Sequence, residues 1–221
     1  MTAPRLGSLT LSAALYGLAL LLLAAATAAH TLLGVPYAKL FSDPTAVAEV
    51  HPFTGALSVV GSLMWAASAA ICLQAGAVLR ARSEHGGLAG YLLAAGLLSA
   101  WLLFDDQFLI HEAIAEDRLG VDQRLFFAAY VAAVAFGAVR FRHLVLASRW
   151  RLLAVSLALL ALSVGIDVLH RPLGVSGEAT VFFEDTFKLL GIAGWLGYFG
   201  QTSFDALRGE GVTTAAATPL R

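Results

Sequence analysis

An uncharged apolar run at residues 88–104, followed at once by the segment FDDQFLIHE, is the feature that most constrains the fold. An α-helix of this length spans about 26 Å, close to the ~30 Å hydrocarbon core of a bilayer. The chain has further apolar blocks, is 59% hydrophobic and is only 13% charged, whereas soluble domains carry about 25% charged residues. The sequence therefore predicts an all-α, polytopic membrane helix bundle.

Six transmembrane helices are predicted from the apolar blocks. They cover residues 9–32, 55–79, 88–110, 125–138, 152–169 and 180–204. The first block has a secretory signal peptide as its alternative, but its apolar stretch exceeds the usual signal core of about 7–15 residues, which favours a retained helix. Residues 1–208 then form a single transmembrane domain, and residues 209–221 form a short flexible cytoplasmic tail.

Charged residues are distributed unevenly between the two ends of the predicted helices. With the N-terminus inside, nine Lys and Arg residues fall on the inner side and five on or near the outer side. The positive-inside rule favours this orientation and places both termini in the cytoplasm. Twelve of the fifteen acidic residues fall on or near the outer face. The positive-inside rule concerns only Lys and Arg, so the uneven distribution of the acidic residues is an independent observation.

Three predicted helices deliver carboxylates to one level near the outer edge of the hydrocarbon. Asp105 lies about 26 Å along a helix that starts at residue 88, and Asp167 lies about 24 Å beyond Arg151. Asp185 lies about 30 Å before Asp205 on the last helix. Charged side chains cost about 2.5–3.5 kcal/mol each at a membrane helix centre and less toward its ends. We therefore expect these carboxylates to share a functional site.

The residue types at this level suit a divalent metal, either zinc or another divalent cation, because carboxylate oxygens and imidazole nitrogens are the ligands such ions use. The expected ligands are Asp105, Asp106, His111, Asp167, His170 and Asp185. The candidate general bases are Glu112 and Glu184. Water on a catalytic metal would hydrolyse an ester or amide of a lipid-like substrate entering from the outer leaflet.

Ion pairing is the simplest alternative to a metal. Asp105 and Asp106 have nearby bases as possible partners, namely Arg124, Arg171 and Lys188. Glu184 and Asp185 stand four and three residues before Lys188, a spacing that favours a local salt bridge on one helix. Adjacent residues on a helix point about 100° apart, so Asp105 and Asp106 are expected to face different neighbours.

Two further classes of function compete with a metal-dependent hydrolase. A proton- or cation-coupled transporter would use the same carboxylates, although the inner halves of the helices lack ionisable residues. A non-catalytic membrane subunit or assembly factor would dock a partner helix on a small-residue ridge. That ridge consists of Gly191, Gly194, Gly197 and Gly200. The lipid bilayer is an expected partner in every case, and the chain lacks a basic tract for nucleic acid.

The segments PFTGALSVVGSLMW (52–65), FDDQFLIHE (104–112) and FFEDTFKLLGI (182–192) resemble those of uncharacterised bacterial multi-pass membrane proteins. That resemblance implies a bacterial inner (plasma) membrane location and no particular activity. In its combination of carboxylates and histidines, the sequence also loosely resembles alkaline-ceramidase-type membrane metal hydrolases. Those enzymes have seven helices and an HxxxH pair on the last one, and this sequence contains no HxxxH.

Overall fold

The structure is a computed structural model and describes residues 6–82, 86–110, 120–173 and 177–209, whose regular secondary structure is entirely helical. The helices are α1 (Leu6–Leu33), α2 (Tyr37–Phe41), α3 (Pro44–Val47), α4 (Ala56–Ala81), α5 (Gly86–Phe108), α7 (Gln123–Arg140), α8 (Arg142–Ala147), α9 (Trp150–Leu173) and α10 (Glu178–Arg208). The chain is therefore all-α, as the sequence predicts.

Within the described residues, four helices are long and apolar enough to cross a membrane. Their apolar stretches are Leu15–Leu33, Ala56–Ala81, Gly86–Phe108 and Trp150–Leu169. Many large apolar side chains face outward on the described helices; Leu63 and Leu97, for example, are each 64% exposed. Soluble monomers rarely expose large contiguous apolar patches. These helices are those of a protein in contact with a lipid bilayer.

The N-terminal unit, Met1–Thr54, contains α1 and two short helices. The ring of His30, in the last turn of α1, stacks on Tyr37 at a centroid distance of 4.0 Å. Asp43 is the N-cap of α3, and its carboxylate accepts hydrogen bonds from the hydroxyl and backbone N–H of Thr45. These bonds hold the pKa of Asp43 below its usual value, because they stabilise the charged form.

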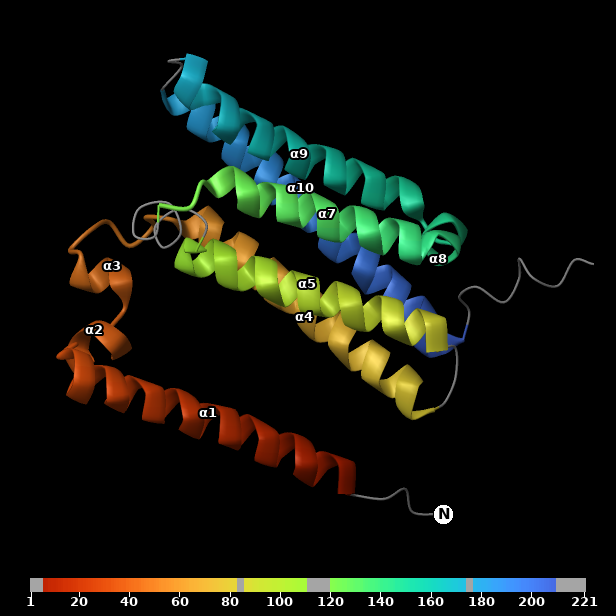
Figure 1. Cartoon of the computed structure of the whole chain (residues 1–221), viewed down its shortest axis with the longest axis horizontal. Coiled ribbons are helices and arrows are strands. Elements are labelled where there is room, and N and C mark those ends of the chain that lie inside the picture. Colours follow the sequence, from red (N-terminus) through yellow and green to blue (C-terminus); the bar gives the residue numbers. More distant parts are fainter. Residues whose placement is uncertain (1–5, 83–85, 111–119, 174–176, 210–221) are drawn as a thin grey trace, which may run out of the picture. The chain divides into compact units, whose positions relative to one another are not determined.

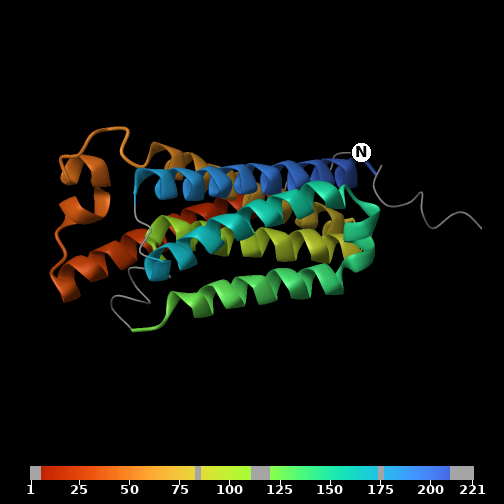
Figure 2. The same ribbon diagram turned by 90° about the horizontal axis from the view of Figure 1, so that it is seen from above.

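The second unit, Gly55–Arg221, is a bundle built on α4, α5, α7, α9 and α10. Helix α4 packs against α5 and α10, and α10 also packs against α9 (Figures 1 and 2). Helix α7 contacts α5 at the edge of the bundle, and the short α8 joins α7 to α9. Because α10 packs beside α4 and touches α5, side chains from all three helices meet.

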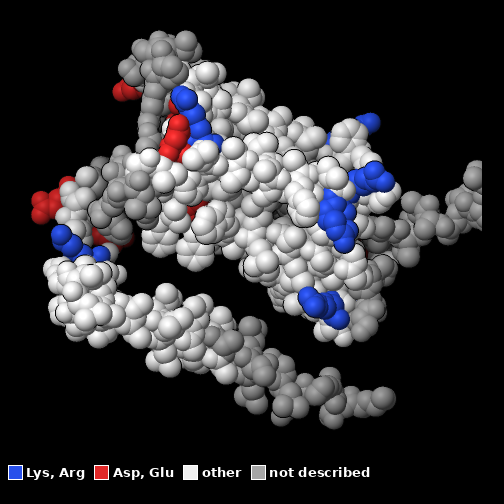
Figure 3. Space-filling view, viewed as in Figure 1, with Lys and Arg blue, Asp and Glu red and all other residues white. Residues whose placement is uncertain are grey.

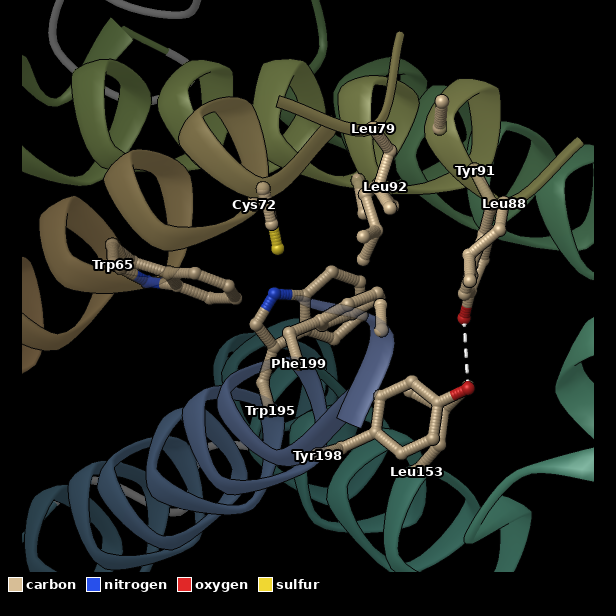
Figure 4. Packing of buried hydrophobic residues seen from close by; sticks show 14 of the residues in the cluster. Trp65, Cys72, Leu79, Leu88, Tyr91, Leu92, Leu153, Trp195, Tyr198 and Phe199 are labelled. Carbon is tan, nitrogen blue, oxygen red and sulfur yellow. Dashed lines mark hydrogen bonds between the residues drawn. The ribbon is translucent and has the colours of Figure 1, made fainter. Parts of the chain in front are cut away.

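The core lies between α4, α5 and α10 and combines aromatic with small side chains. Trp65 and Trp195 meet edge to face with their ring centroids 5.6 Å apart, and Cys72 and Leu92 are completely buried beside them (Figure 4). Several serines are also buried: Ser62, Ser68, Ser99, Ser156, Ser163 and Ser203. Small residues let membrane helices approach closely, and buried hydroxyls hydrogen-bond across their interfaces.

The glycine ridge of α10 packs inside the chain. A Cβ atom at Gly191, Gly194 or Gly197 would meet side chains of α9, namely those of Leu160, Ser156 and Leu152. The Ser156 hydroxyl also donates a hydrogen bond of 2.7 Å to the Gly191 carbonyl oxygen. At these three positions the surface predicted to dock a partner helix is therefore covered by α9 of the same chain.

Candidate functional site

An ion pair between two helices forms the centre of the candidate site. The Lys188 ammonium of α10 donates to Oδ1 of Asp106 in α5. The other oxygen of Asp106, Oδ2, lies 3.5 Å from the Ser62 hydroxyl of α4. Three helices that are separate in sequence thus contribute one charged or polar side chain each. The carboxylate side chain is only 9% exposed, whereas that of Lys188 is 38% exposed.

A small cavity adjoins this pair. Asp106, Lys188 and Asp185 all line it, together with apolar residues of α4 and α10. Its volume is about 30 Å³, and a cavity needs about 10–15 Å³ to accept one water molecule. The cavity is therefore large enough for a water molecule or a small ion between two carboxylates and an ammonium group.

Asp105 faces a different neighbour from Asp106, as the helical periodicity predicts. Asp105 is 4% exposed, so it is more deeply buried than its neighbour. The Tyr130 hydroxyl of α7 is buried and interacts with the Asp105 carboxyl. That hydroxyl makes no hydrogen bond of normal geometry within the described part of the chain. The two adjacent aspartates therefore connect α5 to two different helices, α7 and α10.

The structure describes some of the other predicted site residues and not the rest. Glu184 and Asp167 are half-buried in α10 and α9, and Asp185 is exposed at the cavity. His111 and Glu112 lie outside the described residues, and the side chain of His170 in α9 does as well. The structure thus brings Asp106 and Asp185 to one cavity, while the predicted convergence of the full set stays a prediction.

The predicted metal site has no complete ligand set among the residues that are placed. Within residues 6–82, 86–110, 120–173 and 177–209, no group of three His, Cys, Asp or Glu side chains is arranged to hold one ion. Asp106, one of the expected ligands, is engaged by the Lys188 cation. A metal on Oδ1 of Asp106 would compete with that ammonium group.

Sequence reasoning missed the uncharged polar groups of the interior. The Trp195 indole N–H donates to the Ser99 hydroxyl at 2.9 Å. Farther from Asp106 along the bundle, the hydroxyls of Tyr91 and Tyr198 lie 2.9 Å apart (Figure 4), and the Tyr198 hydroxyl is 2.8 Å from the Ser148 hydroxyl. Serine and tyrosine are common in apolar helices, so nothing in the sequence distinguishes these groups from ordinary packing residues.

One comparison with known proteins identifies a family. A model described as "Domain of unknown function (DUF8692)" matches residues 15–202. The chain belongs to this family. The DUF8692 match includes every helix from α4 to α9 and most of α10, and therefore the whole candidate site. No curated protein and no solved structure matches the chain.

Proposed function

We propose that the protein is a proton-coupled membrane protein and that the pair of Asp106 and Lys188 is its proton-binding site. The observation that carries the proposal is the pair itself, an acid of α5 and a base of α10 that meet within a bundle of apolar helices. Ionisable side chains are costly in such surroundings and commonly mark proton or ion pathways. One proton changes the net charge of the pair, so its protonation state can control how α5 and α10 are held together.

Asp185 offers Lys188 a second partner. It lines the same cavity and precedes Lys188 by three residues on α10, and residues at this spacing share a helix face. A proton on Asp106 removes the negative charge, and Lys188 then moves toward Asp185. Loss of the proton restores the interhelical pair. The lysine therefore has two arrangements, and only one of them ties α10 to α5.

The buried hydroxyls support movement of a proton beyond this pair. Ser99 and Trp195 lie between the pair and the inner end of the bundle, and the linked hydroxyls of Tyr91 and Tyr198 lie further inward. The inner half of the bundle therefore has donors and acceptors where the sequence has no Asp, Glu, Lys, Arg or His. Water molecules between these groups would complete the path.

We propose further that α1, α4, α5, α7, α9 and α10 all cross the membrane, with both termini in the cytoplasm. In a Cys72→Ala background, cysteines introduced at Ala46 and Val121 should react with a membrane-impermeant thiol reagent in intact cells. Cysteines introduced at Arg82 and Leu146 should react only after the cells are opened. The reverse pattern would contradict this orientation and place Asp106 near the cytoplasmic face.

Proton movement is measured with purified protein in liposomes that contain a pH-sensitive dye. A potassium diffusion potential, negative inside, should acidify the lumen faster with the wild-type protein than without protein. Asp106→Asn should reduce the rate to that of protein-free liposomes, because an amide takes up no proton in this pH range.

Asp122→Asn is the matched control for the liposome measurement. Asp122 is the exposed N-cap of α7, and asparagine is an equally good N-cap. This variant removes one carboxylate but leaves the proposed site intact, so its rate should equal that of the wild-type protein. Equal rates for wild type and Asp106→Asn would contradict the proposal.

A divalent-metal site is the second candidate, and the observation that favours it is the presence of two carboxylates, Asp106 and Asp185, at one small cavity. A cation bound there would replace the Lys188 ammonium. Lipid ester or amide hydrolysis, with Glu112 or Glu184 as the general base, depends on such a metal. Elemental analysis of the purified wild-type protein and of its Asp185→Asn variant distinguishes a metal site from a proton-binding site.

A further inference from the structure

A second, larger cavity lies on the other side of the bundle, away from the charged site. Its volume is about 250 Å³, and it is open on one side. Its walls come from α5, α7 and α9, with α10 behind them; they include Ala95, Leu98, Ala133, Gly137, Leu157 and Phe199. The small side chains that α7 turns toward α5 leave this space unfilled.

The chemistry of the walls determines what can fill the cavity. Aliphatic and aromatic side chains form nearly all of its surface, and a buried water molecule needs about 2–4 polar partners. Apolar cavities of about 150 Å³ bind benzene rather than water. A cavity of 250 Å³ that opens between lipid-facing helices therefore accepts part of an acyl chain, which the bilayer supplies at high concentration.

The inner end of the cavity is next to positive charge. Phe141 and Val145 line it there, and the Arg140 guanidinium lies 5.2 Å from the centroid of the Phe141 ring. Arg142 is exposed at the start of α8. Lys and Arg side chains gather at this end of the bundle (Figure 3). Arg149 is already paired with Asp205 at 2.6 Å, whereas Arg140 and Arg142 flank the cavity residue Phe141 in the chain.

We propose that this cavity binds one acyl chain of an anionic phospholipid, with the lipid phosphate at Arg140 and Arg142. The chain enters between α7 and the neighbouring helices, and the headgroup stays at the cytoplasmic surface. Guanidinium groups bind phosphate oxygens with charge-assisted, often bidentate hydrogen bonds. Basic pockets between membrane helices on the cytoplasmic side are known to select such headgroups. The site is independent of the proposed proton-binding pair.

Filling the cavity tests the acyl-chain part of the proposal. A Cβ atom at Gly137 would meet nothing within 4 Å, so Gly137→Leu should place its side chain in the cavity without a clash. The protein is reconstituted in nanodiscs of phosphatidylcholine and phosphatidylglycerol, and retained lipid is measured by native mass spectrometry. Gly137→Leu should lose most of the phosphatidylglycerol that the wild-type protein retains.

Gly165→Leu is the control for that substitution. Gly165 is also a helical glycine, its Cβ atom would likewise meet nothing within 4 Å, and it does not line the cavity. This variant should retain lipid as the wild-type protein does. Unchanged lipid retention by Gly137→Leu, in protein that melts at the wild-type temperature, would overturn the proposal.

The headgroup part is tested with Arg140→Gln/Arg142→Gln. Removing two charges at the membrane surface should lower the preference for phosphatidylglycerol over phosphatidylcholine by about 10- to 30-fold. The control is Arg80→Gln/Arg82→Gln, which removes two exposed arginines from the inner end of α4. That control should keep the wild-type preference. A preference that is unchanged in the first variant, or lost equally in both, would overturn the assignment of the phosphate to Arg140 and Arg142.

Discussion

Asp106→Asn should lower the stability of the detergent-solubilised protein by about 1–3 kcal/mol, because it leaves the Lys188 cation without its interhelical partner. Breaking a fully buried ion pair costs about 3–5 kcal/mol. The expected loss is smaller here because the Lys188 side chain is 38% exposed and because Asp185 lines the same cavity. The midpoint of thermal unfolding, followed by circular dichroism, measures the loss.

A double-mutant cycle measures the interaction energy between Asp106 and Lys188 apart from the contacts that each side chain makes with other residues. Lys188→Met removes the cation and keeps an apolar chain of similar length, so Asp106→Asn/Lys188→Met should recover part of the stability that either single variant loses. The exposed pair of Arg149 and Asp205 provides the comparison, and such pairs contribute about 0–1 kcal/mol. A coupling energy for Asp106 and Lys188 no larger than that of the exposed pair would show that the candidate site is an ordinary surface contact.

The sequence is sufficient to predict an all-α chain and the positions of its long apolar helices. Composition and the lengths of apolar blocks determine which segments can cross a membrane, and α4, α5 and α9 appear where those blocks predict them. The divergence of Asp105 and Asp106 follows from the 100° turn per residue. Asp105 lies toward Tyr130, and Asp106 lies toward Lys188, as that turn requires.

The sequence offers Lys188 several acidic partners, Asp106 among them, but does not choose between them. Spacing along one helix favours Glu184 and Asp185 as partners, whereas Asp106 is far away in the chain and reaches Lys188 because α4, α5 and α10 pack together. Periodicity shows that a helix has an apolar face but does not show which helix covers it. The same limit applies to the glycine ridge of α10, which the sequence predicts as a surface for a partner helix and which α9 covers at Gly191, Gly194 and Gly197.

The close contact of that ridge with α9 makes a strong prediction for Gly191→Ala. A Cβ atom there would lie 2.7 Å from Cγ of Leu160 and 3.0 Å from its backbone nitrogen. The backbone nitrogen cannot move away unless the two helices separate, and their separation would also strain the hydrogen bond from Ser156 to the Gly191 carbonyl. Overpacking of this kind costs about 1–3 kcal/mol. The thermal midpoint of Gly191→Ala should therefore fall well below that of the wild-type protein.

Gly200→Ala provides the control on the same helix, because a Cβ atom at Gly200 would meet nothing within 4 Å. Alanine is favoured over glycine within a helix by about 0.5–1 kcal/mol, so this variant should be as stable as the wild-type protein or slightly more stable. The same chemical change thus has opposite expected signs at two positions of one ridge. If both variants were equally stable, α9 and α10 could not be packed as closely as the Leu160 contact requires, and the ridge would again be available to a helix of another protein.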